Sequence, residues 1–244
     1  MTTSPDLSGR IALVTGASRG IGYFTAKALA AAGAHVIAVA RTVGGLEELD
    51  DEIKAAGSET TLVPLNLTDF DGIDRLGRAI FDRWGRLDGL VANAGALGVL
   101  TPVSHLEPKE FDKAMAINLT ANYRLIRSLD LLLRQSTAGR ALFVSSGAAD
   151  GGKPYWGLYA ASKAALEALV RSYAAETAST SLKVNVFRPG PARTALRAKA
   201  LPGEDPETLP HPSELAPALI DMVSPTYAET STLFDFRAGT SRPL

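Results

Sequence analysis

A tyrosine and a lysine four residues apart form the most chemically informative pair in the sequence. Tyr159 and Lys163 lie one turn apart on a predicted helix, so their side chains share one face with Cβ atoms about 5–6 Å apart. An ammonium close to a phenol stabilises the phenolate, and we expect it to lower the tyrosine pKa from its reference of about 10 toward neutral pH. Tyrosine could then act as a general acid in a reduction or as a general base in an oxidation. The same spacing arises by chance on many helices, so the pair gains its meaning from the motifs around it.

A glycine-rich turn near the start of the chain points to a nucleotide. Gly16, Gly20 and Gly22 follow the predicted strand Ile11–Thr15 and open a predicted helix. Glycine permits positive φ, and without a Cβ atom it lets a pyrophosphate approach the backbone and the helix pack closely on the sheet. The amides at the helix start would then face the anion. The spacing Gly-x-x-x-Gly-x-Gly differs from the usual dinucleotide fingerprint, so a plain structural turn is the alternative interpretation.

Two arginines near this turn favour a phosphorylated cofactor. The second predicted strand ends in Ala40-Arg41, where NAD-selective enzymes usually place an acidic residue on the adenosine ribose hydroxyls. Arg41 and Arg19 could both reach a ribose 2′-phosphate, because a guanidinium fork suits phosphate oxygens. We therefore expect NADP(H) to be preferred, with NAD(H) as the second cofactor. The alternative is that both arginines are solvated surface residues.

The elements that must position these residues alternate along the chain. Short apolar runs rich in β-branched residues alternate with Ala- and Leu-rich amphipathic stretches, which indicates repeated βα units and a parallel sheet. The predicted strands are Ile11–Thr15, His35–Ala40, Thr61–Leu65, Gly89–Ala92, Ala141–Ser145, Lys183–Phe187 and Thr232–Phe234. The predicted helices are Ile21–Ala32, Gly45–Ala56, Phe70–Trp84, Pro108–Gln135, Leu158–Ser179 and Ser213–Met222. Right-handed crossovers would place helices on both faces, so we expect an α/β, doubly wound Rossmann-type fold with a seven-stranded, mostly parallel sheet.

Composition favours one domain over residues 1–244 without metal or disulfide support. Hydrophobic residues make up 46% of the 244 residues, enough for a sizeable core. The sequence contains no cysteine, which excludes disulfides, thiolate nucleophiles and cysteine metal sites. The three histidines lack the spacing and the carboxylate neighbours of a metal site, so no metal is expected; they are His35, His105 and His211.

Charge and hydropathy argue against two classes of partner. The formal net charge of −1 gives no electrostatic footprint for nucleic acid or for an anionic membrane. No stretch approaches the ~20 apolar residues that span a bilayer. The segment Met1–Arg10 is polar and contains Pro5, so we expect neither a signal peptide nor an anchor. The resulting expectation is a cytoplasmic protein that acts on a small molecule.

Prolines concentrate late in the chain and predict an irregular segment. They are Pro189, Pro191, Pro202, Pro206, Pro210 and Pro212. So many prolines suppress regular helix and strand. Long loops at the carboxyl ends of parallel strands commonly carry sites, so we expect a substrate loop at about residues 190–212. An ordered surface loop without a function is the alternative.

Five motifs in a fixed order give the chain a family resemblance. They are the glycine turn, Asn93-Ala94-Gly95, Asn118, Ser145-Ser146 and Tyr159-Ala160-Ala161-Ser162-Lys163. In that order and at those intervals, the chain resembles the short-chain dehydrogenase/reductase family in its shorter single-domain branch, from about Leu7 to the early 230s. The resemblance implies an NAD(P)-dependent oxidoreductase that transfers hydride between nicotinamide and a ketone or secondary alcohol.

The resemblance also implies catalytic roles. Tyr159 would be the proton donor or acceptor, and Ser146, thirteen residues earlier, would hydrogen-bond the substrate oxygen. Lys163 would depress the tyrosine pKa and bind the nicotinamide ribose hydroxyls. Asn118 would hold a water that links Lys163 to solvent.

A larger set of cofactor-binding residues follows from the same resemblance. Asn66 stands where the family usually has aspartate, and its amide oxygen can still accept from the adenine amino group, whereas Asp69 is predicted to be the N-cap of the next helix. Pro189-Gly190 and Thr194 resemble the segment that positions the nicotinamide. The expected cofactor-binding set is Gly16, Ser18, Arg19, Gly20, Ile21, Gly22, Arg41, Asn66, Leu67, Asn93, Ala94, Gly95, Tyr159, Lys163, Pro189, Gly190 and Thr194.

Two other functions are compatible with parts of the pattern. A dinucleotide-binding regulatory protein could have the fold without turnover, although the complete Asn-Ser-Tyr-Lys set argues against it. Nucleotide-sugar epimerases and dehydratases are the second alternative, but those relatives tend to be longer and to have a different glycine spacing. By resemblance, the helices Pro108–Gln135 and Leu158–Ser179 would form the contacts of a homodimer or homotetramer.

Overall fold

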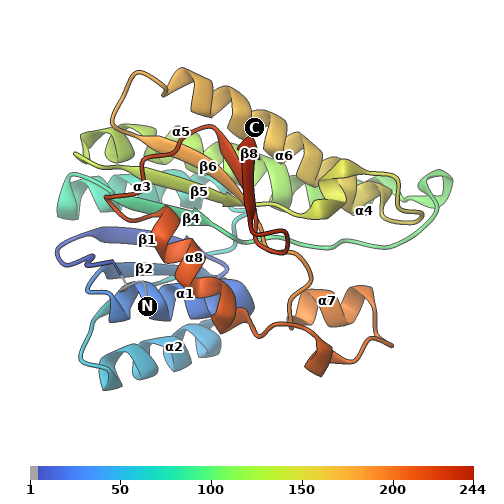
Figure 1. Cartoon of the computed structure of the whole chain (residues 1–244), viewed down its shortest axis with the longest axis horizontal. Coiled ribbons are helices and arrows are strands. Elements are labelled where there is room, and N and C mark those ends of the chain that lie inside the picture. Colours follow the sequence, from blue (N-terminus) through green and yellow to red (C-terminus); the bar gives the residue numbers. More distant parts are fainter. Residues whose placement is uncertain (1–4) are drawn as a thin grey trace.

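A central β-sheet runs through the molecule between two layers of helices (Figure 1). The computed structural model describes residues 5–244, and within this range the sheet has eight strands in the order β3-β2-β1-β4-β5-β6-β7-β8. The strands are β1 (Ile11–Thr15), β2 (His35–Ala40), β3 (Thr60–Pro64), β4 (Gly89–Ala92), β5 (Arg140–Val144), β6 (Lys183–Arg188), β7 (Thr232–Asp235) and β8 (Thr240–Pro243). All pairings are parallel except that of β7 with β8. This confirms the α/β, doubly wound fold; residues 1–4 of the expected domain and of the polar segment Met1–Arg10 lie outside the described residues.

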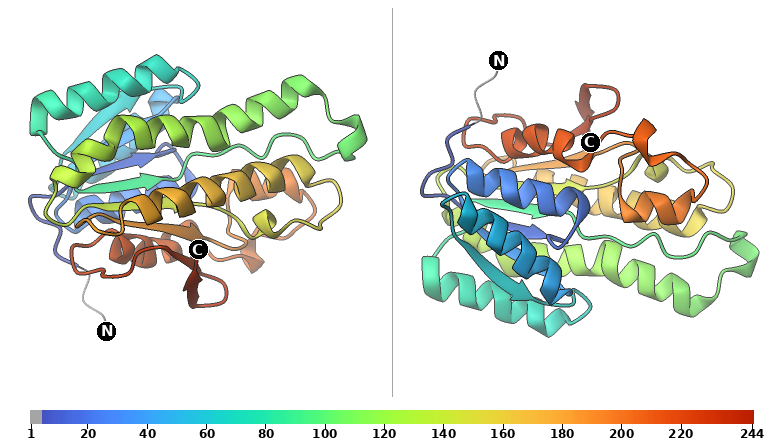
Figure 2. Two further views of the ribbon diagram at one scale, coloured as in Figure 1. Left: turned by 90° about the horizontal axis from the view of Figure 1, so that it is seen from above. Right: turned by 90° about the horizontal axis from the view of Figure 1, so that it is seen from below.

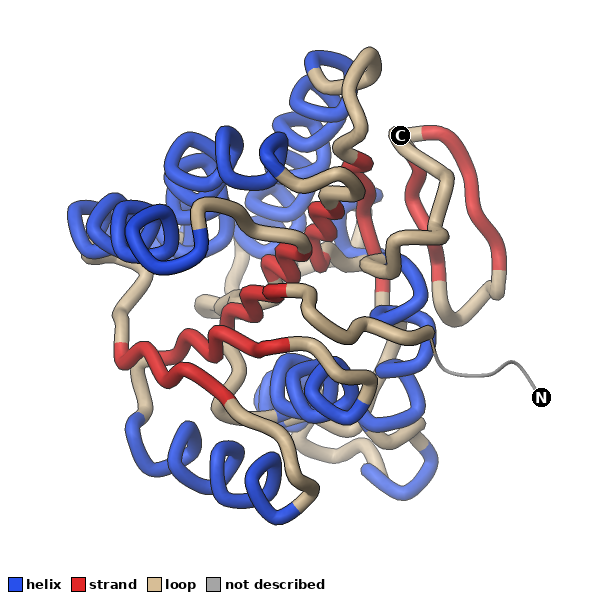
Figure 3. Tube along the Cα trace, turned by 90° about the vertical axis from the view of Figure 1, so that its left-hand side faces the viewer, coloured by secondary structure: helices blue, strands red, loops and turns tan. Residues whose placement is uncertain are grey.

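Helices cover both faces of the sheet, as Figures 2 and 3 show. One face carries α1 (Gly20–Ala31), α2 (Val43–Ala55) and α8 (Pro212–Met222), which share one hydrophobic core. The other carries α3 (Phe70–Trp84), α5 (Ala121–Gln135) and α6 (Gly157–Glu176), which share a second core. Two short helices, α4 (Pro108–Met115) and α7 (Ala195–Ala200), lie toward one end of the sheet. No helix in residues 5–244 is long and apolar enough to cross a membrane.

The strands are apolar throughout because both of their faces are covered. Side chains alternate across a strand, so Leu13 of β1 packs into the core under α3, α5 and α6, while Val14 packs under α1, α2 and α8. Phe143 and Leu142 of β5 divide between the two cores in the same way. Strands that need apolar residues at every position leave no alternating pattern, which is why they read in the sequence as short continuous hydrophobic runs.

The strand order reverses at β1, which pairs with β2 on one side and with β4 on the other. In open parallel sheets, such a reversal opens a crevice at the carboxyl ends of the two central strands, and ligands bind there. The glycine turn follows β1, the Asn93 motif follows β4, and Ser146 follows β5. The fold therefore delivers the predicted motifs to a single end of the sheet.

The predicted strands and helices are present with ends that shift by at most three residues, and three local features are new. The helix expected over Pro108–Gln135 contains a π-helical turn, Ala116–Thr120, between α4 and α5. Helix α7 forms inside the proline-rich segment because Pro191 and Pro202 flank it rather than enter it. The last strand turns back as the antiparallel hairpin β7–β8, so the sheet has one strand more than the seven expected.

Candidate active site

One cavity at the carboxyl ends of the strands collects most of the expected site residues. Its volume is about 820 Å³, within the roughly 300–1,000 Å³ that is typical of ligand sites. The expected residues that line it are Gly16, Ser18, Arg19, Gly20, Ile21, Arg41, Asn66, Leu67, Asn93, Ala94, Gly95, Ser146, Tyr159, Lys163, Pro189, Gly190 and Thr194. Gly22 and Asn118 do not line the cavity and are buried behind its wall.

Tyr159 and Lys163 share one face of α6, and both are buried in the cavity wall. The exposed fractions are 6% for Tyr159 and 3% for Lys163. The lysine Nζ lies 6.0 Å from the centroid of the tyrosine ring and donates a hydrogen bond of 2.8 Å to the Val144 carbonyl oxygen at the end of β5. An ammonium has three donors. The strand therefore anchors Lys163 through one N–H and leaves others for a partner in the cavity.

Burial sets the charge states of this pair. It lowers the pKa of Lys163 to about 8, and the nearby Glu167 carboxylate acts in the opposite direction. It raises the pKa of Tyr159, while the Ser146 hydroxyl lowers it. The expectation of a depressed tyrosine pKa is therefore corrected, because desolvation of the enclosed phenolate outweighs the other influences. At neutral pH the phenol holds its proton and the lysine is charged.

The two adjacent serines after β5 point to different partners. The Ser145 Oγ is buried and donates to Glu167 Oε1 at 2.6 Å. Ser146 faces the cavity, where its Oγ accepts from the Ala148 backbone N–H at 3.2 Å and lies close enough to Tyr159 to lower its pKa. The structure thus brings Ser146 and not Ser145 to the phenol, in agreement with the choice made on the thirteen-residue interval.

Asn118 braces the loop after β4 against the helices. Its Oδ1 accepts from the Ala96 backbone N–H at 2.8 Å, and its Nδ2 donates to the Ala96 carbonyl at 2.8 Å and to the Ser162 Oγ at 2.9 Å. The residue lies in the π-helical turn, a distortion frequent at functional sites. Its own carbonyl accepts from Asn122 Nδ2 at 2.8 Å, which leaves one lone pair for the water expected there. That water stays a prediction.

The glycine turn is a cradle that side chains would fill. Gly16 and Gly20 have φ of +69° and +60°, values that favour glycine. A Cβ atom on Gly22 would lie 2.5 Å from the Asn93 Nδ2 and against the Gly16 carbonyl, so the close packing of α1 needs glycine there. The Asn93 Nδ2 in turn donates to the Thr15 carbonyl at 3.0 Å. The first amides of α1 have no side-chain cap, as an anion site at a helix start requires.

The two candidate phosphate-binding arginines are available for a ligand. Arg19 and Arg41 are exposed, line the cavity and form no ion pair within residues 5–244. Asn66 lies beside them at the end of β3, where its Oδ1 accepts from the Thr68 backbone N–H at 3.2 Å. Asp69 caps α3 by accepting from the Gly72 N–H at 2.9 Å, as predicted. These groups fit the adenosine end of a nicotinamide dinucleotide that carries a 2′-phosphate.

The other end of the cavity is shaped by two further glycines. A Cβ on Gly95 would lie 3.3 Å from the Asn118 Oδ1 and 3.4 Å from the Lys163 Nζ, so the absence of a side chain lets the lysine reach the cavity. Gly190 has φ of +69°, and a Cβ there would lie 2.9 Å from the Arg237 Cβ. Both positions suit a close approach of a flat ring to the backbone.

An apolar wall stands beside the tyrosine on the substrate side. Leu97, Trp156 and Ala200 form a buried cluster with Tyr159, and the indole packs edge-on against the phenol with ring centroids 6.1 Å apart. Leu196 and Leu201 pack against this cluster. Of the two aromatic residues considered as pocket wall, Trp156 lines the cavity, whereas Tyr155 is exposed.

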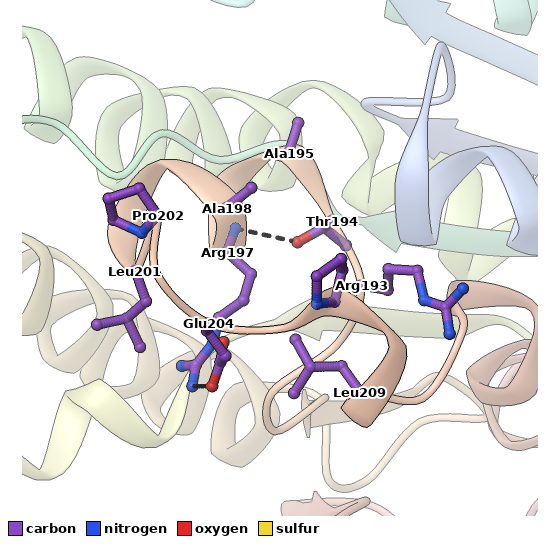
Figure 4. Close-up of a pocket in the computed structure, with 10 residues that line it drawn as sticks. Arg193, Thr194, Ala195, Arg197, Ala198, Leu201, Pro202, Glu204 and Leu209 are labelled. Carbon is purple, nitrogen blue, oxygen red and sulfur yellow. Dashed lines mark hydrogen bonds and ion pairs between the residues drawn. The ribbon is translucent and has the colours of Figure 1, made fainter.

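The proline-rich segment folds over this wall and encloses a second, smaller cavity of about 430 Å³ (Figure 4). Arg197 of α7 pairs with Glu204 through two contacts of 2.6 Å, and Arg193 pairs with Glu207 at 2.8 Å. Thr194 caps α7 by accepting from the Arg197 N–H at 3.2 Å. The segment is therefore internally ordered, and Thr194 is the residue of it that lies nearest the glycine turn at Gly20.

Sequence reasoning missed one charged group directly behind the site. Arg188, at the end of β6, pairs with the buried Glu167 and with Asp150. The signal was present, because Glu167 lies four residues after Lys163 and so continues the face that carries Tyr159 and Lys163. Among the described residues, no group of three His, Cys, Asp or Glu side chains could hold a metal ion.

Comparison with known proteins assigns this arrangement to a family. A family model described as short chain dehydrogenase matches residues 10–205. The oxidoreductase YciK of Escherichia coli K12 is 36% identical over 237 residues, which cover 96% of this chain and 94% of the relative. A solved short chain dehydrogenase from Shigella flexneri, complexed with NADP, is 36% identical with a TM-score of 0.91, over 96% of this chain and 99% of that chain. Another from Escherichia coli CFT073, complexed with NADPH, is 35% identical with a TM-score of 0.91, over 96% and 98% of the two chains.

Proposed function

This chain belongs to the short chain dehydrogenase family, and on that premise we propose that it transfers a hydride between NADP(H) and a ketone or secondary alcohol, with Tyr159 as the general acid or base. The observation that carries this proposal is the convergence of Ser146, Tyr159 and Lys163 on one wall of a cavity whose other end is a glycine turn with two unpaired arginines. Neither end alone specifies this chemistry, but their connection in one cavity does.

The chain's residues divide the cofactor between them. The uncapped amides of α1 bind the pyrophosphate, Arg19 and Arg41 bind the 2′-phosphate, and Asn66 accepts from the adenine amino group. Lys163 binds the nicotinamide ribose, while Gly190 and Thr194 position the ring. When bound, the nicotinamide supplies the hydride chemistry. The NADP and NADPH complexes of the two solved relatives support the choice of cofactor.

Tyr159 gives its proton to the substrate oxygen in the reductive direction. Because burial raises its pKa, the phenol is protonated at neutral pH and is ready to act as an acid. The Ser146 hydroxyl and the phenol hydroxyl both donate to the substrate oxygen, and these bonds strengthen as negative charge develops on it. The charged Lys163 then stabilises the phenolate that remains.

The apolar wall of Leu97, Trp156 and Leu196 favours a substrate whose carbonyl carries a hydrophobic substituent. We propose that residues 190–212 act as the substrate loop of one domain spanning residues 1–244. Exposed Phe111, Tyr123 and Leu131 on α4 and α5 support the expected homodimer or homotetramer.

The decisive experiment combines a carbonyl screen with one substitution. NADPH oxidation is followed across ketones of increasing hydrophobic size with wild type and with Tyr159→Phe. We expect Tyr159→Phe to keep NADPH binding and to lose turnover by roughly 10²–10⁴-fold, because only the proton donor is removed. Tyr155→Phe is the matched control, since that tyrosine is a close neighbour but lies outside the cavity lining, and it should retain the wild-type rate.

Two outcomes would contradict the proposal. An undiminished rate in Tyr159→Phe would mean that the proton donor lies elsewhere. Complete inactivity of the wild type on every carbonyl, with tight NADPH binding, would favour the regulatory protein without turnover.

A further inference from the structure

A buried ionic cluster lies directly behind the proposed active site. The Arg188 guanidinium is 4% exposed and contacts two carboxylates, that of Glu167, 9% exposed, and that of Asp150, 65% exposed. Its Nε and one terminal nitrogen donate to the two Glu167 oxygens, each at 2.8 Å. Its terminal nitrogens donate to the two Asp150 oxygens at 2.8 and 3.0 Å. One planar group thus forms two bidentate pairs, the geometry that makes arginine different from lysine.

Each arm of the cluster is joined to a segment that carries a proposed site residue. Glu167 lies on the same face of α6 as Tyr159 and Lys163, one turn further along. Asp150 ends the 3₁₀ turn Gly147–Asp150, which starts immediately after Ser146. Arg188 itself is followed by Pro189 and Gly190. The guanidinium therefore connects the three segments that supply the serine, the lysine and the ring-positioning turn.

The Ser145 hydroxyl closes the connection. It donates to Glu167 Oε1 at 2.6 Å, the same oxygen that accepts from the Arg188 Nε. Its backbone N–H donates to the Phe187 carbonyl at 2.8 Å, beside Arg188. Because Ser145 is held from both sides, the next residue, Ser146, leaves the strand in one direction, toward Tyr159.

Arg188 also keeps Glu167 away from the lysine. Side chains at i and i+4 of a helix are neighbours, so a buried Glu167 without a guanidinium partner would be drawn to the Lys163 ammonium. In the structure, the Glu167 oxygens are occupied by Arg188 and Ser145, and Lys163 Nζ is free to bind the Val144 carbonyl and to face the cavity. The four charges of Asp150, Arg188, Glu167 and Lys163 sum to zero, so the cluster is neutral as a unit.

We propose that Arg188 is a positioning residue, which acts through Glu167 and Asp150 to fix where Ser146 and Lys163 stand relative to Tyr159. This inference rests on the proposed oxidoreductase function, and it adds residues to which the family comparison gives no role. Arg188, Glu167 and Asp150 do not line the cavity, so none of them contacts the substrate.

The test compares Arg→Lys substitutions at two buried arginines. Arg188→Lys keeps the charge but loses the double fork, and we expect kcat to fall on the order of 10- to 100-fold, the loss expected for misplacement of catalytic groups by about 1 Å. NADPH affinity should change much less than kcat. Arg140, 5% exposed at the start of β5, is the matched control because it donates only to backbone carbonyls at the opposite end of the strands. Arg140→Lys should lower the thermal midpoint and leave kcat per folded molecule unchanged.

A second variant guards against loss of folding. Asp150→Asn changes an exposed side chain, so the protein should remain folded while the turn after Ser146 loosens. We expect a smaller fall in kcat than in Arg188→Lys. The double variant Arg188→Lys with Asp150→Asn should be no slower than Arg188→Lys alone, because one fork serves both arms.

Hydrogen exchange gives a readout that does not depend on turnover. The amides of residues 145–151 should exchange faster in Arg188→Lys and in Asp150→Asn, but not in Arg140→Lys. The proposal is overturned by wild-type kcat in Arg188→Lys, by an equal loss of kcat in Arg140→Lys, or by unchanged exchange in this segment. A wild type that turns over no carbonyl would instead refute the proposed function, and the exchange result would still decide the positioning role.

Discussion

Replacing Arg41 by alanine should change cofactor selectivity without changing the fold. Arg41 and Arg19 are exposed at the adenosine end of the cavity and have no ion-pair partner within the described range, so neither is needed to neutralise a carboxylate of the chain. Their removal should therefore cost binding of the 2′-phosphate and little else. NADH, which lacks that phosphate, should bind the variant as it binds the wild type.

The size of the effect follows from the exposure of the two arginines. A hydrogen bond to a charged group contributes about 1.5–3 kcal/mol, and solvent screening of exposed groups favours the lower end of that range. About 1.4 kcal/mol is a factor of ten in the dissociation constant. We expect NADPH affinity to fall about tenfold in Arg41→Ala and roughly a hundredfold when Arg19→Ala is added, if the two contacts are independent.

Fluorescence titration of NADPH and NADH at two salt concentrations provides the measurement. Higher salt should narrow the gap between the two cofactors, because the arginine contacts are screened. Arg78→Ala on α3 is the control, since that exposed arginine pairs only with Asp82 and lies outside the cavity. The reasoning is refuted if wild type binds NADH as tightly as NADPH, or if Arg41→Ala weakens both cofactors equally.

Two further predictions concern the lysine and the glycine turn. Burial lowers the Lys163 pKa from 10.5 to about 8, so the ammonium is present below that pH and is lost above it; kcat/KM for reduction should fall as pH rises through about 8, and a profile that stays flat to pH 10 would contradict this role. Gly22→Ala should lower the thermal midpoint and weaken NADPH binding, at an overpacking cost of about 1–3 kcal/mol, because its Cβ would lie 2.5 Å from Asn93 Nδ2. Gly44→Ala at the start of α2, where a Cβ meets nothing within 4 Å, is the matched control for differential scanning fluorimetry, and equal effects of the two substitutions would count against the packing argument.

The alternation of elements could be predicted because it depends on local pattern. Strands covered on both faces need continuous apolar runs, and the helices between them need one apolar stripe, so residues such as Leu13 and Val14 identify β1 from sequence alone. The Asp69 cap was equally accessible, since an N-cap is decided by the side chain and the next three residues. The glycine turn and Tyr159 with Lys163 were found because their spacing is itself the functional constraint.

What the sequence did not show depends on contacts between distant segments. The π-helical turn at Asn118 forms where that side chain bonds the Ala96 backbone, twenty-two positions earlier in the chain. The strand β8 depends on a hairpin that pairs back onto β7. The pairing of Arg188 with Asp150 joins two loops thirty-eight residues apart. No periodicity within a segment reports such partners.

The direction of the Tyr159 pKa shows the same limit in energetic terms. Helical spacing correctly placed an ammonium beside the phenol, and a charge pair considered alone lowers the tyrosine pKa. The spacing could not reveal how completely Trp156 and the neighbouring apolar side chains enclose the ring. Desolvation therefore reverses the sign that the pair alone would give.

The gathering of every proposed site residue at the carboxyl ends of the strands has a practical consequence for laboratory evolution. Libraries restricted to the apolar wall, for example at Leu97, Trp156 and Leu196, should diversify the ketones accepted while the framework keeps its tolerance to heat. Stabilising changes can be sought separately around Arg140, at the far end of the same strands. The two searches can run in parallel and their winners can be recombined, because distant sites generally contribute additively.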